Sequence, residues 1–545
     1  MSESAAVRLR PPMTRVDRVI GCGDPDRPAV TYASQTVTYR QLADQVARAA
    51  NGLRTLGVRR GDRVAVYAQK QIETVVALLA VSAAGGIFVP VNPLFKARHL
   101  AHVAADCGPR VLITTAERLD TVRTALPEDA SVQKVVLIGG PARATATAAG
   151  TATAAAAAER FEVIGWQRLA ECAPDPVPDG ESVIDTDLAA ILYTSGSTGG
   201  PKGVVLSHRN LIAGAESVAH YLEHSAEDTI LAPLPLSFDA GLSQLTISLI
   251  AGAHVVLANY LLPRDLVRLC ARHAITAMTC VPPLWMQLAA QEWPQEAAGR
   301  MRYFANTGGR MPAATLARLK ELFPQAKPYL MYGLTEAFRS TYLDPAEADR
   351  RPDSIGKAIP NAQILVVRPD GTPCAPGEHG ELVHRGALVA QGYWNDPERT
   401  ARRFRPVPQA AIAEGTAGAA ARPELAVWSG DTVYRDEEGF VYFVGRADEM
   451  IKTSGYRVSP AEVEEAVYAT GMAAEAVALG VGDERLGQHI ALVVSEPCDA
   501  TLLRKALAEQ LPTYMQPQRI LVLAQLPRSV NGKFDRAELR RVVER

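Results

Sequence analysis

Apolar positions in the first third of the chain alternate between the spacing of helices and the spacing of strands. Helical spacing covers Thr38–Leu53, Gly57 ends it, and Asp62–Tyr67 follows as a strand-like run. The alternation continues through a helix at Glu73–Ala84, a strand at Phe88–Val91, a helix around His99–Ala105 and a strand at Val111–Thr114. Alternating strands and helices imply right-handed βαβ units, so we predict a parallel sheet with helices on both faces.

Further along, the pattern first continues and then changes. Strand-like runs between helices occur at Ile230–Pro233, Ala253–Leu257, Ala277–Val281, Arg302–Asn306 and Pro328–Tyr332. After residue 355 the chain becomes β-rich, with runs at Ile364–Val367, Gly380–Val383 and Gly439–Val444, and it ends in an α+β block. We therefore predict an α/β fold with a large N-terminal domain, residues 1–447, of parallel-sheet α/β subdomains and a β-rich subdomain, and a small mobile α+β C-terminal domain, residues 448–545.

Three segments show neither the helical nor the strand spacing of apolar residues. Residues 1–35 are rich in proline and glycine, and we expect them to be irregular. Residues 141–160 are an Ala/Thr-rich low-complexity run, and residues 406–423 are rich in alanine, glycine and proline. We interpret these last two segments as surface insertions without chemistry.

Composition excludes several classes of function. The 545 residues are 48% hydrophobic and 21% charged, with a formal net charge of −2, so neither nucleic acid nor a membrane surface is an expected partner. The longest uncharged stretch, Thr74–Phe95, contains glycines and prolines and reads as helix, turn and strand rather than a membrane span. No secretory signal opens the chain, and its 7 cysteines form no CxxC pair, which predicts a cytoplasmic protein with reduced thiols and no zinc site.

The segment Tyr193–Gly203 carries the clearest chemistry. It combines glycines, small hydroxyl residues and Lys202 directly after a strand-like run, as a loop that binds phosphate would. The P-loop of NTPases does not fit, because Pro201 replaces a required glycine and Gly203 replaces the Ser or Thr that holds Mg²⁺. A flexible linker is the alternative interpretation of the segment alone.

Further motifs follow this loop in a fixed order, at Tyr332–Ala337, Ser429–Asp431, Gly445–Lys452, Ser454–Arg457 and Asn531–Lys533. With them, the chain resembles the adenylate-forming superfamily of AMP-dependent acyl-CoA ligases, luciferases and adenylation domains of peptide synthetases, over nearly its whole length. The resemblance implies an AMP-forming ligase that converts a carboxylic acid and MgATP to an acyl-adenylate and then passes the acyl group to a thiol. In that family the small C-terminal domain rotates between the two half-reactions.

The resemblance also assigns roles to residues that bind ATP. The loop residues implied to hold the β- and γ-phosphates are Thr194, Ser195, Gly196, Ser197, Thr198, Gly199 and Lys202. The residues implied to bind the nucleoside are Gly308, Gly309 and Tyr332 around adenine, Asp431 at the ribose and Arg446 near the nucleotide. Asp448 matches the hinge, and Ser454–Arg457 matches the loop that lines the thiol tunnel.

The catalytic residues follow from the same resemblance. The implied roles are a contact to the α-phosphate for Thr335, Mg²⁺ binding for Glu336 with Thr198, and the catalytic cation for Lys533. Attack of a carboxylate on a phosphate brings two anions together, so such a protein works by positioning and charge stabilisation. Lys533 would bridge the carboxylate and the α-phosphate, while Lys202 and Mg²⁺ would neutralise the leaving pyrophosphate.

The class of the substrate acid is suggested by Ser237-Phe238-Asp239, which resembles the corresponding motif of amino-acid-activating domains. A carboxylate in an apolar pocket requires a cation, and the ammonium of an amino acid supplies one. Helix capping at Ala240 is the alternative role for Asp239. By the same match the pocket is expected to contain Phe238, Ala240, Ser243, Ala305, Thr307, Met331 and Arg339. Small side chains favour a small substrate, and Arg339 either recognises a second carboxylate or pairs with a wall residue.

Three functions remain open on the sequence alone. The first is a stand-alone ligase that loads a small amino acid onto the phosphopantetheine of a carrier protein, and the second is a CoA ligase for a non-amino acid. Leu261–Asp265 and Glu336–Ser340 are similar to a bacterial subgroup of AMP-forming ligases associated with exosortase loci. The third function, a non-catalytic binding protein on this fold, is disfavoured because Lys202, Glu336, Asp431 and Lys533 are all present.

Overall fold

The computed structural model describes the chain except for residues 1–12, 127–129, 140–160, 175–182, 195–200, 412–422, 447–448, 454–455, 484–485 and 512. The low-complexity run 141–160 and most of the 406–423 segment therefore lie outside the described residues, as does the predicted hinge residue Asp448. The described residues form three sheets.

The first sheet has the order β7-β6-β5-β3-β4-β8-β9. Its strands are β3 (Arg63–Tyr67), β4 (Ile87–Pro90), β5 (Val111–Thr115), β6 (Lys134–Ile138), β7 (Glu162–Gly165), β8 (Leu188–Thr194) and β9 (Lys202–Ser207). The pairs from β7 to β8 are parallel, as predicted, because a helix connects most consecutive strands. Strand β9 instead runs antiparallel to β8, so the segment Tyr193–Gly203 connects the two strands of a hairpin at one edge.

The second sheet contains the β-rich part of the chain. Its order is β17-β18-β20-β21-β16-β15-β14-β13-β12-β10-β11-β1-β2, and β19 pairs with β20. Its strands are β1 (Pro28–Tyr32), β2 (Gln35–Thr38), β10 (Thr229–Ala232), β11 (His254–Leu257), β12 (Ala277–Cys280), β13 (Tyr303–Asn306), β14 (Lys327–Tyr332), β15 (Thr341–Leu343), β16 (Ser354–Ala358), β17 (Ala362–Val367), β18 (Gly380–Gly386), β19 (Phe404–Pro406), β20 (Leu425–Arg435) and β21 (Val441–Arg446). The pairs from β11 to β14 through β10, β12 and β13 are parallel, and the pairs from β14 to β18 are antiparallel.

The third sheet belongs to the C-terminal part and has the order β23-β22-β25-β24, with β26 paired to β25. Its strands are β22 (Ile451–Thr453), β23 (Tyr456–Val458), β24 (Ala476–Asp483), β25 (Gly487–Ser495) and β26 (Arg519–Leu523). Buried residues such as Val463 and Leu503 pack helices against this sheet in a separate core. The described C-terminal residues thus have the α+β organisation that the sequence predicts.

Helices cover the sheets. They are α1 (Tyr39–Thr55), α2 (Ile72–Ala83), α3 (Ala97–Cys107), α4 (Leu119–Ala125), α5 (Gln167–Ala170), α6 (His208–Tyr221), α7 (Asp239–Ile250), α8 (Pro263–Arg272), α9 (Pro282–Ala289), α10 (Gln295–Arg300), α11 (Ala313–Leu322), α12 (Pro397–Arg403), α13 (Pro460–Thr470), α14 (Ala500–Gln510) and α15 (Arg536–Val543). Helix α1 starts where predicted because Thr38 and Gln41 form a capping box. Helix α7 is buried along its whole length between the layers, which suits its uncharged sequence after Asp239.

The expectation that residues 1–35 are irregular is wrong for the described part of that segment. A 3-10 helix η1 spans Val16–Cys22, and β1 pairs in parallel with β11. Pro28 is compatible with this strand because it is the first residue, where the missing N–H removes little of the ladder. The neighbouring Val30 is fully buried, so tertiary packing forms the strand despite the local composition.

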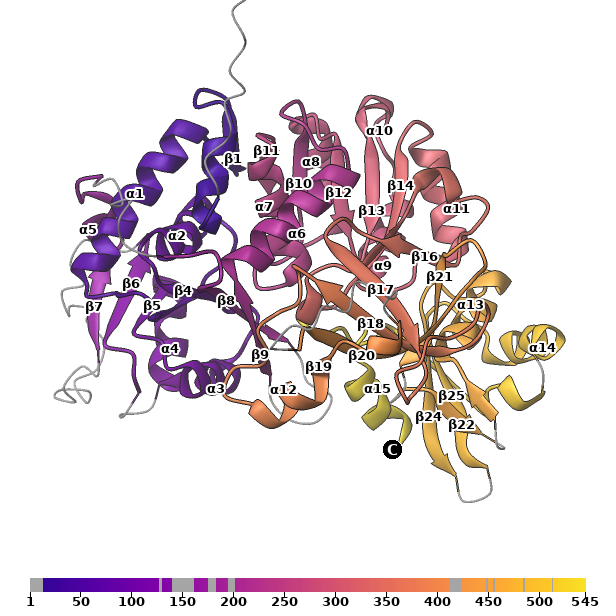
Figure 1. Cartoon of the computed structure of the whole chain (residues 1–545). Coiled ribbons are helices and arrows are strands. Elements are labelled where there is room, and N and C mark those ends of the chain that lie inside the picture. The colour runs from indigo at the N-terminus through magenta and orange to yellow at the C-terminus, as the bar shows by residue number, and fades with distance from the viewer. Residues whose placement is uncertain are drawn as a thin grey trace, which may run out of the picture.

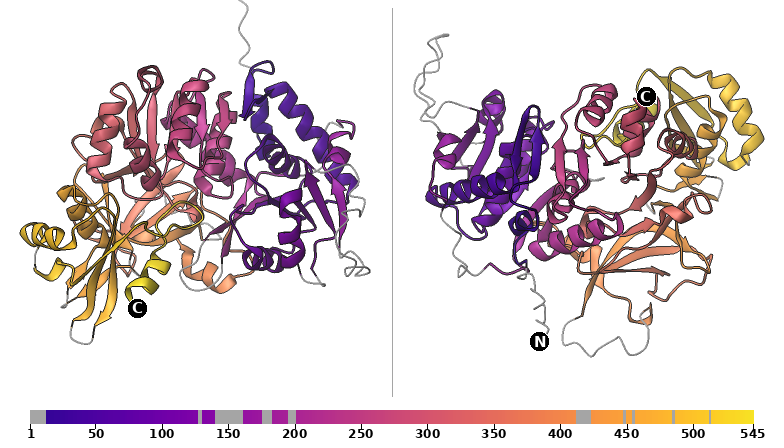
Figure 2. Two further views of the ribbon diagram at one scale, coloured as in Figure 1. Left: turned by 180° about the vertical axis from the view of Figure 1, so that it is seen from behind. Right: turned by 90° about the horizontal axis from the view of Figure 1, so that it is seen from above.

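The C-terminal part lies at the opposite end of the molecule from β7, beside the β-rich strands (Figures 1 and 2). Several polar contacts connect it to the rest of the chain, among them the following two. Arg310 pairs with Glu465 of α13 at 3.4 Å between Nε and Oε1, and Asn92 Nδ2 donates to Asn531 Oδ1 at 3.1 Å. The C-terminal residues 528–534 therefore lie against the N-terminal sheets.

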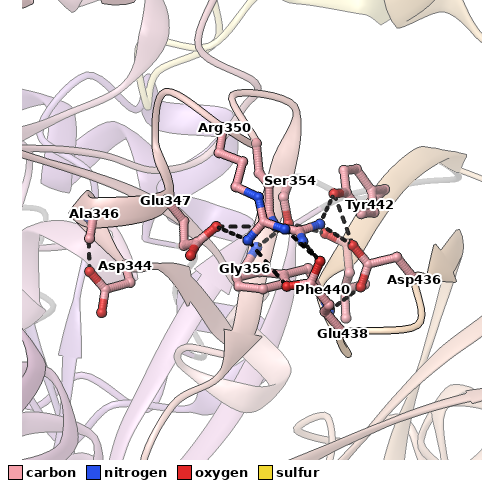
Figure 3. Close-up of polar contacts among 12 residues, drawn as sticks. Asp344, Ala346, Glu347, Arg350, Ser354, Gly356, Asp436, Glu438, Phe440 and Tyr442 are labelled. Atoms are coloured by element: carbon pink, nitrogen blue, oxygen red, sulfur yellow. Dashed lines mark hydrogen bonds and ion pairs between the residues drawn. The ribbon is translucent and has the colours of Figure 1, made fainter.

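A cluster of ion pairs fixes the turn between β20 and β21 to the segment before β16 (Figure 3). Arg351 donates to both Asp436 and Glu438 in that turn, and its guanidinium lies 4.2 Å from the Phe440 ring centroid. The same guanidinium donates to the Tyr442 hydroxyl at 3.0 Å. The hairpin that carries Asp431 is thus attached at its far end.

Candidate active site

Lys202, Glu336 and Tyr393 meet although they are distant in the sequence. Lys202 is the first residue of β9, and Glu336 lies in the 3-10 helix η3 (Thr335–Ala337) after β14. Lys202 Nζ donates to Glu336 Oε1 at 2.7 Å and to the Tyr393 hydroxyl at 2.9 Å, and that hydroxyl donates to Glu336 at 2.5 Å. Burial alone raises the pKa of Glu336, but Lys202 and Arg403 outweigh it and lower the pKa to about 2.

The phosphate loop is described only at its ends. Thr194 ends β8, and its buried Oγ1 has no hydrogen-bond partner among the described residues. Ser195, Gly196, Ser197, Thr198 and Gly199 lie outside the described residues, so their implied roles stay predictions. The β8–β9 pairing sets Thr194 opposite Lys202, which brings the ends of the loop together beside the Lys202–Glu336 pair.

A second group contains Tyr332, Asp431 and Arg446. Tyr332 ends β14, and its hydroxyl donates to Asp431 Oδ2. Asp431 and Arg446 are register partners in the β20–β21 pair, with Arg446 Nε 3.4 Å from Asp431 Oδ1. Burial raises the pKa of Asp431, while Arg446 opposes that rise. Asp431 Oδ1 is buried and accepts no hydrogen bond among the described residues, so it can accept one from a ligand.

Lys533 reaches the same region from the C-terminal part. Its Nζ lies 5.2 Å from the centroid of the Phe238 ring, and Gly308 approaches its aliphatic stem. Gly308 has a φ of 78°, so its backbone conformation favours glycine, and a Cβ there would lie 2.9 Å from Lys533 Cε and displace the end of that side chain. Burial lowers the pKa of Lys533, and the charge of Asp239 opposes this. Gly309, by contrast, is exposed.

Asp239 is buried at the start of α7. Its Oδ1 accepts a hydrogen bond from the N–H of Ala240 at 2.7 Å, and its Oδ2 accepts one from Thr335 Oγ1 at 3.3 Å. Arg339 forms an ion pair with it, with Nη1 3.9 Å from Oδ2. Helix α7 begins at Asp239 itself, and Phe238 is its N-cap. The alternative role of Asp239 as a helix cap is therefore supported only by its single bond to the N–H of Ala240.

The other predicted pocket residues are all buried and sit on neighbouring elements. Ala240 and Ser243 belong to α7, while Ala305 and Met331 lie on the adjacent parallel strands β13 and β14. Thr307 follows β13 directly and is also buried. The carboxyl ends of these strands meet the start of α7, which is where ligands bind in parallel α/β sheets.

Three residues near the site were missed by sequence reasoning. Tyr393 contacts both Lys202 and Glu336, and Asn92 contacts Asn531. Lys70 is buried and donates to the carbonyl oxygens of residues 232, 233 and 234 at 2.5 to 3.1 Å, and burial lowers its pKa to about 7. The partners of these residues are far away in sequence, so no local pattern reveals them.

A pocket of about 520 Å³ adjoins these groups. Its walls come from residues 66–74, 90–94, 233–237, 258–261, 281–287 and 528–532. Its lining includes Ser237, two residues before Asp239, and Gly532, the residue before Lys533. Its size is that of a site for a small molecule or an extended chain.

Comparison with known families identifies the chain. The sequence model of the family described as AMP-binding enzyme matches residues 22–394. The chain belongs to this family. The model described as AMP-binding enzyme C-terminal domain matches residues 462–533, so both parts of this AMP-forming ligase are recognised. The predicted superfamily and enzyme class are thereby confirmed.

Relatives of this AMP-binding enzyme differ in substrate. It is 30% identical over 543 residues to indoleacetate–CoA ligase of Aromatoleum aromaticum, covering 97% of this chain and 98% of that protein. It is also 30% identical over 533 residues to L-proline–[L-prolyl-carrier protein] ligase of Pseudomonas fluorescens, covering 95% and 97%. The chain spans only 6% of the length of a linear gramicidin synthase of Brevibacillus parabrevis, to which it is 30% identical over 524 residues, 94% of this chain. The acceptor is thus CoA in one relative and a carrier protein in another.

The fold matches a solved enzyme of the same type. O-succinylbenzoate coenzyme A synthetase of Bacillus subtilis in complex with ATP and magnesium ion has a TM-score of 0.77 and 26% identity, with 97% of this chain and 99% of that chain covered. ATP and Mg²⁺ are the partners expected of an AMP-binding enzyme. No helix in the described part of the chain is long and apolar enough to cross a membrane.

Proposed function

We propose that this AMP-binding enzyme activates a small amino acid as aminoacyl-AMP and transfers it to the phosphopantetheine thiol of a stand-alone carrier protein. The observation that carries the proposal is the buried carboxylate of Asp239, which accepts a hydrogen bond from Thr335 and whose charge opposes the lowering of the Lys533 pKa by burial. An amino acid presents a carboxylate and an ammonium on one carbon atom. A cation and an anion beside one pocket match that pair, and a buried carboxylate gains its counter-charge from the substrate.

The described residues fit ATP and Mg²⁺. Asp431 has a buried oxygen without a hydrogen-bond donor among the described residues, as a group that accepts ribose hydroxyls requires. Glu336 offers a carboxylate held ionised by Lys202, and hard cations prefer such oxygen ligands. When bound, Mg²⁺ would neutralise phosphate charge. Lys533 would orient the acid's carboxylate toward the α-phosphate, and Lys202 would stabilise the charge that develops on the leaving pyrophosphate.

The choice of acceptor is supported by similarity. One relative is named as a ligase for an L-prolyl carrier protein and covers nearly the whole chain. The 520 Å³ pocket passes Leu94 and Leu261, which are 60% and 95% exposed, and reaches Gly532, the residue before Lys533. An extended phosphopantetheine arm could enter past these residues, whether it belongs to a carrier protein or to CoA.

A second candidate is an acyl-CoA ligase for an acid without an amino group. It is favoured by Arg339, which already gives Asp239 a positive neighbour at 3.9 Å. In that case the Asp239–Arg339 pair is a part of the pocket wall and needs no ammonium. The relative named indoleacetate–CoA ligase is a member of this kind.

Pyrophosphate exchange across the proteinogenic amino acids and a panel of fatty and aryl acids tests the proposal. ATP-dependent exchange with one or a few amino acids is the expected result, since adenylation is reversible and precedes transfer to any acceptor. Exchange with fatty or aryl acids only would establish the second candidate. The adenylated product is then offered to CoA and to phosphopantetheinylated carrier protein in parallel.

Asp239→Asn tests the ammonium pairing directly. We expect kcat/KM in the exchange assay to fall at least about 100-fold for the amino acid, since a charge-assisted hydrogen bond in a dry pocket is lost. ATP affinity should be unchanged. Ser248→Ala on the same buried helix is the matched control, because Ser248 bonds only within α7 through its Oγ. Unaltered kinetics of the Asp239→Asn enzyme would exclude Asp239 as the ammonium receptor.

A further inference from the structure

The backbone turns sharply just before Arg339. Phe338 has φ 56° and ψ −48°, and the N–H of Arg339 donates to the carbonyl of Ala337 at 2.6 Å. This is a γ-turn with positive central φ, a strained conformation for a bulky residue. The fully buried Phe338 ring, which packs against Gly214, holds the turn. The strained turn thus directs Arg339 inward.

The guanidinium of Arg339 is buried with few acceptors. Arg339 is 2% exposed, and its Nε has no hydrogen-bond acceptor among the described residues. Nη1 donates to the carbonyl of Phe338 at 3.2 Å, and its 3.9 Å separation from Asp239 is an ion pair too long for a hydrogen bond. A guanidinium has five N–H donors, and burying them without acceptors is costly. The site therefore needs an acceptor that the described protein does not supply.

The carboxylate of Asp239 cannot fully neutralise both the guanidinium of Arg339 and a substrate ammonium. Its oxygens already accept from Ala240 N–H and from Thr335 Oγ1. If a substrate ammonium joins it, two positive groups share one buried carboxylate while Lys533 takes the reacting carboxylate. A neutral amino acid would leave this cluster with one uncompensated positive charge. A substrate with a second carboxylate would balance it.

A hydroxyl next to this cluster is also unpaired. Ser243 lies four residues after Asp239 on α7 and hence on the same face of the helix. It is 1% exposed, and its Oγ has no hydrogen-bond partner among the described residues. Buried hydroxyls usually have partners. A polar group on the substrate beyond its ammonium would satisfy Ser243, whereas an aliphatic side chain would leave it unpaired.

We infer that the substrate is an acidic amino acid, whose second carboxylate is bound by the guanidinium of Arg339. The inference rests on the proposed function, since it assigns the ammonium to Asp239 and the reacting carboxylate to Lys533. Three charged groups of the substrate then meet three charged side chains. The small neighbours Ala240 and Ala305 limit the length of the side chain that fits.

Substrate pairs that differ in one charge test the inference on the wild-type enzyme. Pyrophosphate exchange is compared for aspartate with asparagine, glutamate with glutamine, and 2-aminoadipate with norleucine. We expect one dicarboxylic amino acid to exceed its neutral counterpart at least about 100-fold in kcat/KM, because a site built for a charged group rejects an analogue that leaves it unpaired. Exchange with neutral amino acids alone would overturn this inference and leave the proposed function standing. Exchange only with succinate, glutarate or other acids without an amine would overturn both.

Arg339→Met provides the second test. It should reduce kcat/KM for the acidic amino acid at least about 100-fold and reduce or reverse the preference over the neutral counterpart. ATP affinity measured by calorimetry should stay as in the wild type, which shows that the variant is folded. Arg318→Met, which removes an exposed arginine paired with Glu321 on α11, is the matched control. An unchanged preference in a variant that still binds ATP would exclude Arg339 as the receptor.

Discussion

Lys533 illustrates how much a single residue depends on its surroundings. The side chain has a lowered pKa through burial, and the oppositely charged Asp239 limits that lowering. Its stem passes Gly308, where any Cβ would collide with it. The ammonium of Lys533, buried with little negative charge around it and held in one position, is preorganised to bind an anion.

Lys533→Ala is expected to abolish adenylation. The cation that brings carboxylate and α-phosphate together would be missing, so we expect pyrophosphate exchange to fall at least about 100-fold. Thioester formation from a supplied acyl-adenylate should be retained, because that step needs no such cation. Lys505→Ala on the exposed face of α14 is the control for loss of a C-terminal lysine. Loss of both half-reactions in a folded Lys533→Ala enzyme would contradict this division.

The sequence was sufficient to predict the site residues that lie within motifs, but it was insufficient to predict the residues that contact them. Lys202 was named from the composition of its loop, and Glu336 and Asp431 were named from the family resemblance. The structure brings each of them into a polar cluster. Tyr393 was missed because it is 191 residues from Lys202, and a single tyrosine carries no signal of such a contact. Whether Arg339 pairs with Asp239 also depends on the turn at Phe338, which no sequence rule predicts.

At the scale of elements, the β20–β21 hairpin carries residues of the candidate site at one end and a cluster of ion pairs at the other. One end carries Asp431 and Arg446, and Arg351 attaches the turn at the other end. Figure 3 shows Asp436, Glu438 and Phe440 of that turn. The Arg351 side chain is 9% exposed, in contrast to that of its neighbour Arg350 at 61%. Two adjacent arginines in one cluster thus differ in burial and in partners, since Arg351 also contacts Asp436 and Tyr442.

Arg351→Met should destabilise the protein more than Arg350→Met does, because it leaves partly buried Asp436 without its cation and removes the contact with Phe440. Urea denaturation provides the measurement. Arg350→Met should cost at most about 1 kcal/mol, as expected for an exposed ion pair. Equal losses in the two variants would mean that burial does not determine the strength of this cluster.

Elements were predicted best where one local signal dominates. The Thr38 cap and the apolar period define α1 to within two residues at its end. Strand β1 was missed because Pro28 and the surrounding glycines resemble a loop, while its burial depends on β11, which is distant in the sequence. The antiparallel β8–β9 hairpin was not anticipated either, since alternation of strands and helices predicts only parallel neighbours.

At the scale of the whole molecule, buried histidines make the stability of the fold depend on pH. His208 is 1% exposed at the first turn of α6, and its Nδ1 accepts the N–H of Val16 at 3.2 Å, which requires the neutral form. Burial lowers the pKa of His208 from 6.5 to about 4. Burial likewise lowers the pKa of His384 to about 3 and that of His254 to about 4.

These groups should make the fold sensitive to acid. A histidine with a lowered folded pKa binds its proton more readily in the unfolded chain, so the free energy of unfolding falls as the pH drops from 6.5 toward 4. For His208 the loss amounts to about 3 kcal/mol. Urea denaturation at a series of pH values measures it, and His208→Gln should flatten the dependence in this window. His379→Gln, at an exposed position, is the matched control for the loss of a histidine.

The bond between Asn92 and Asn531 has a further consequence, since it joins the loop of Lys533 to the first part of the chain through two short side chains. Cysteines at these positions could be joined by a short thiol-reactive cross-linker that a reductant cleaves. If the C-terminal part rotates between the two half-reactions, as the family resemblance implies, the cross-linked enzyme would make its activated acid and could not pass it on. It should exchange pyrophosphate at the normal rate and release no thioester until the reductant is added, whereas either single cysteine variant should complete both steps. The contact thus offers a reversible lock for separating the two halves of the reaction in time.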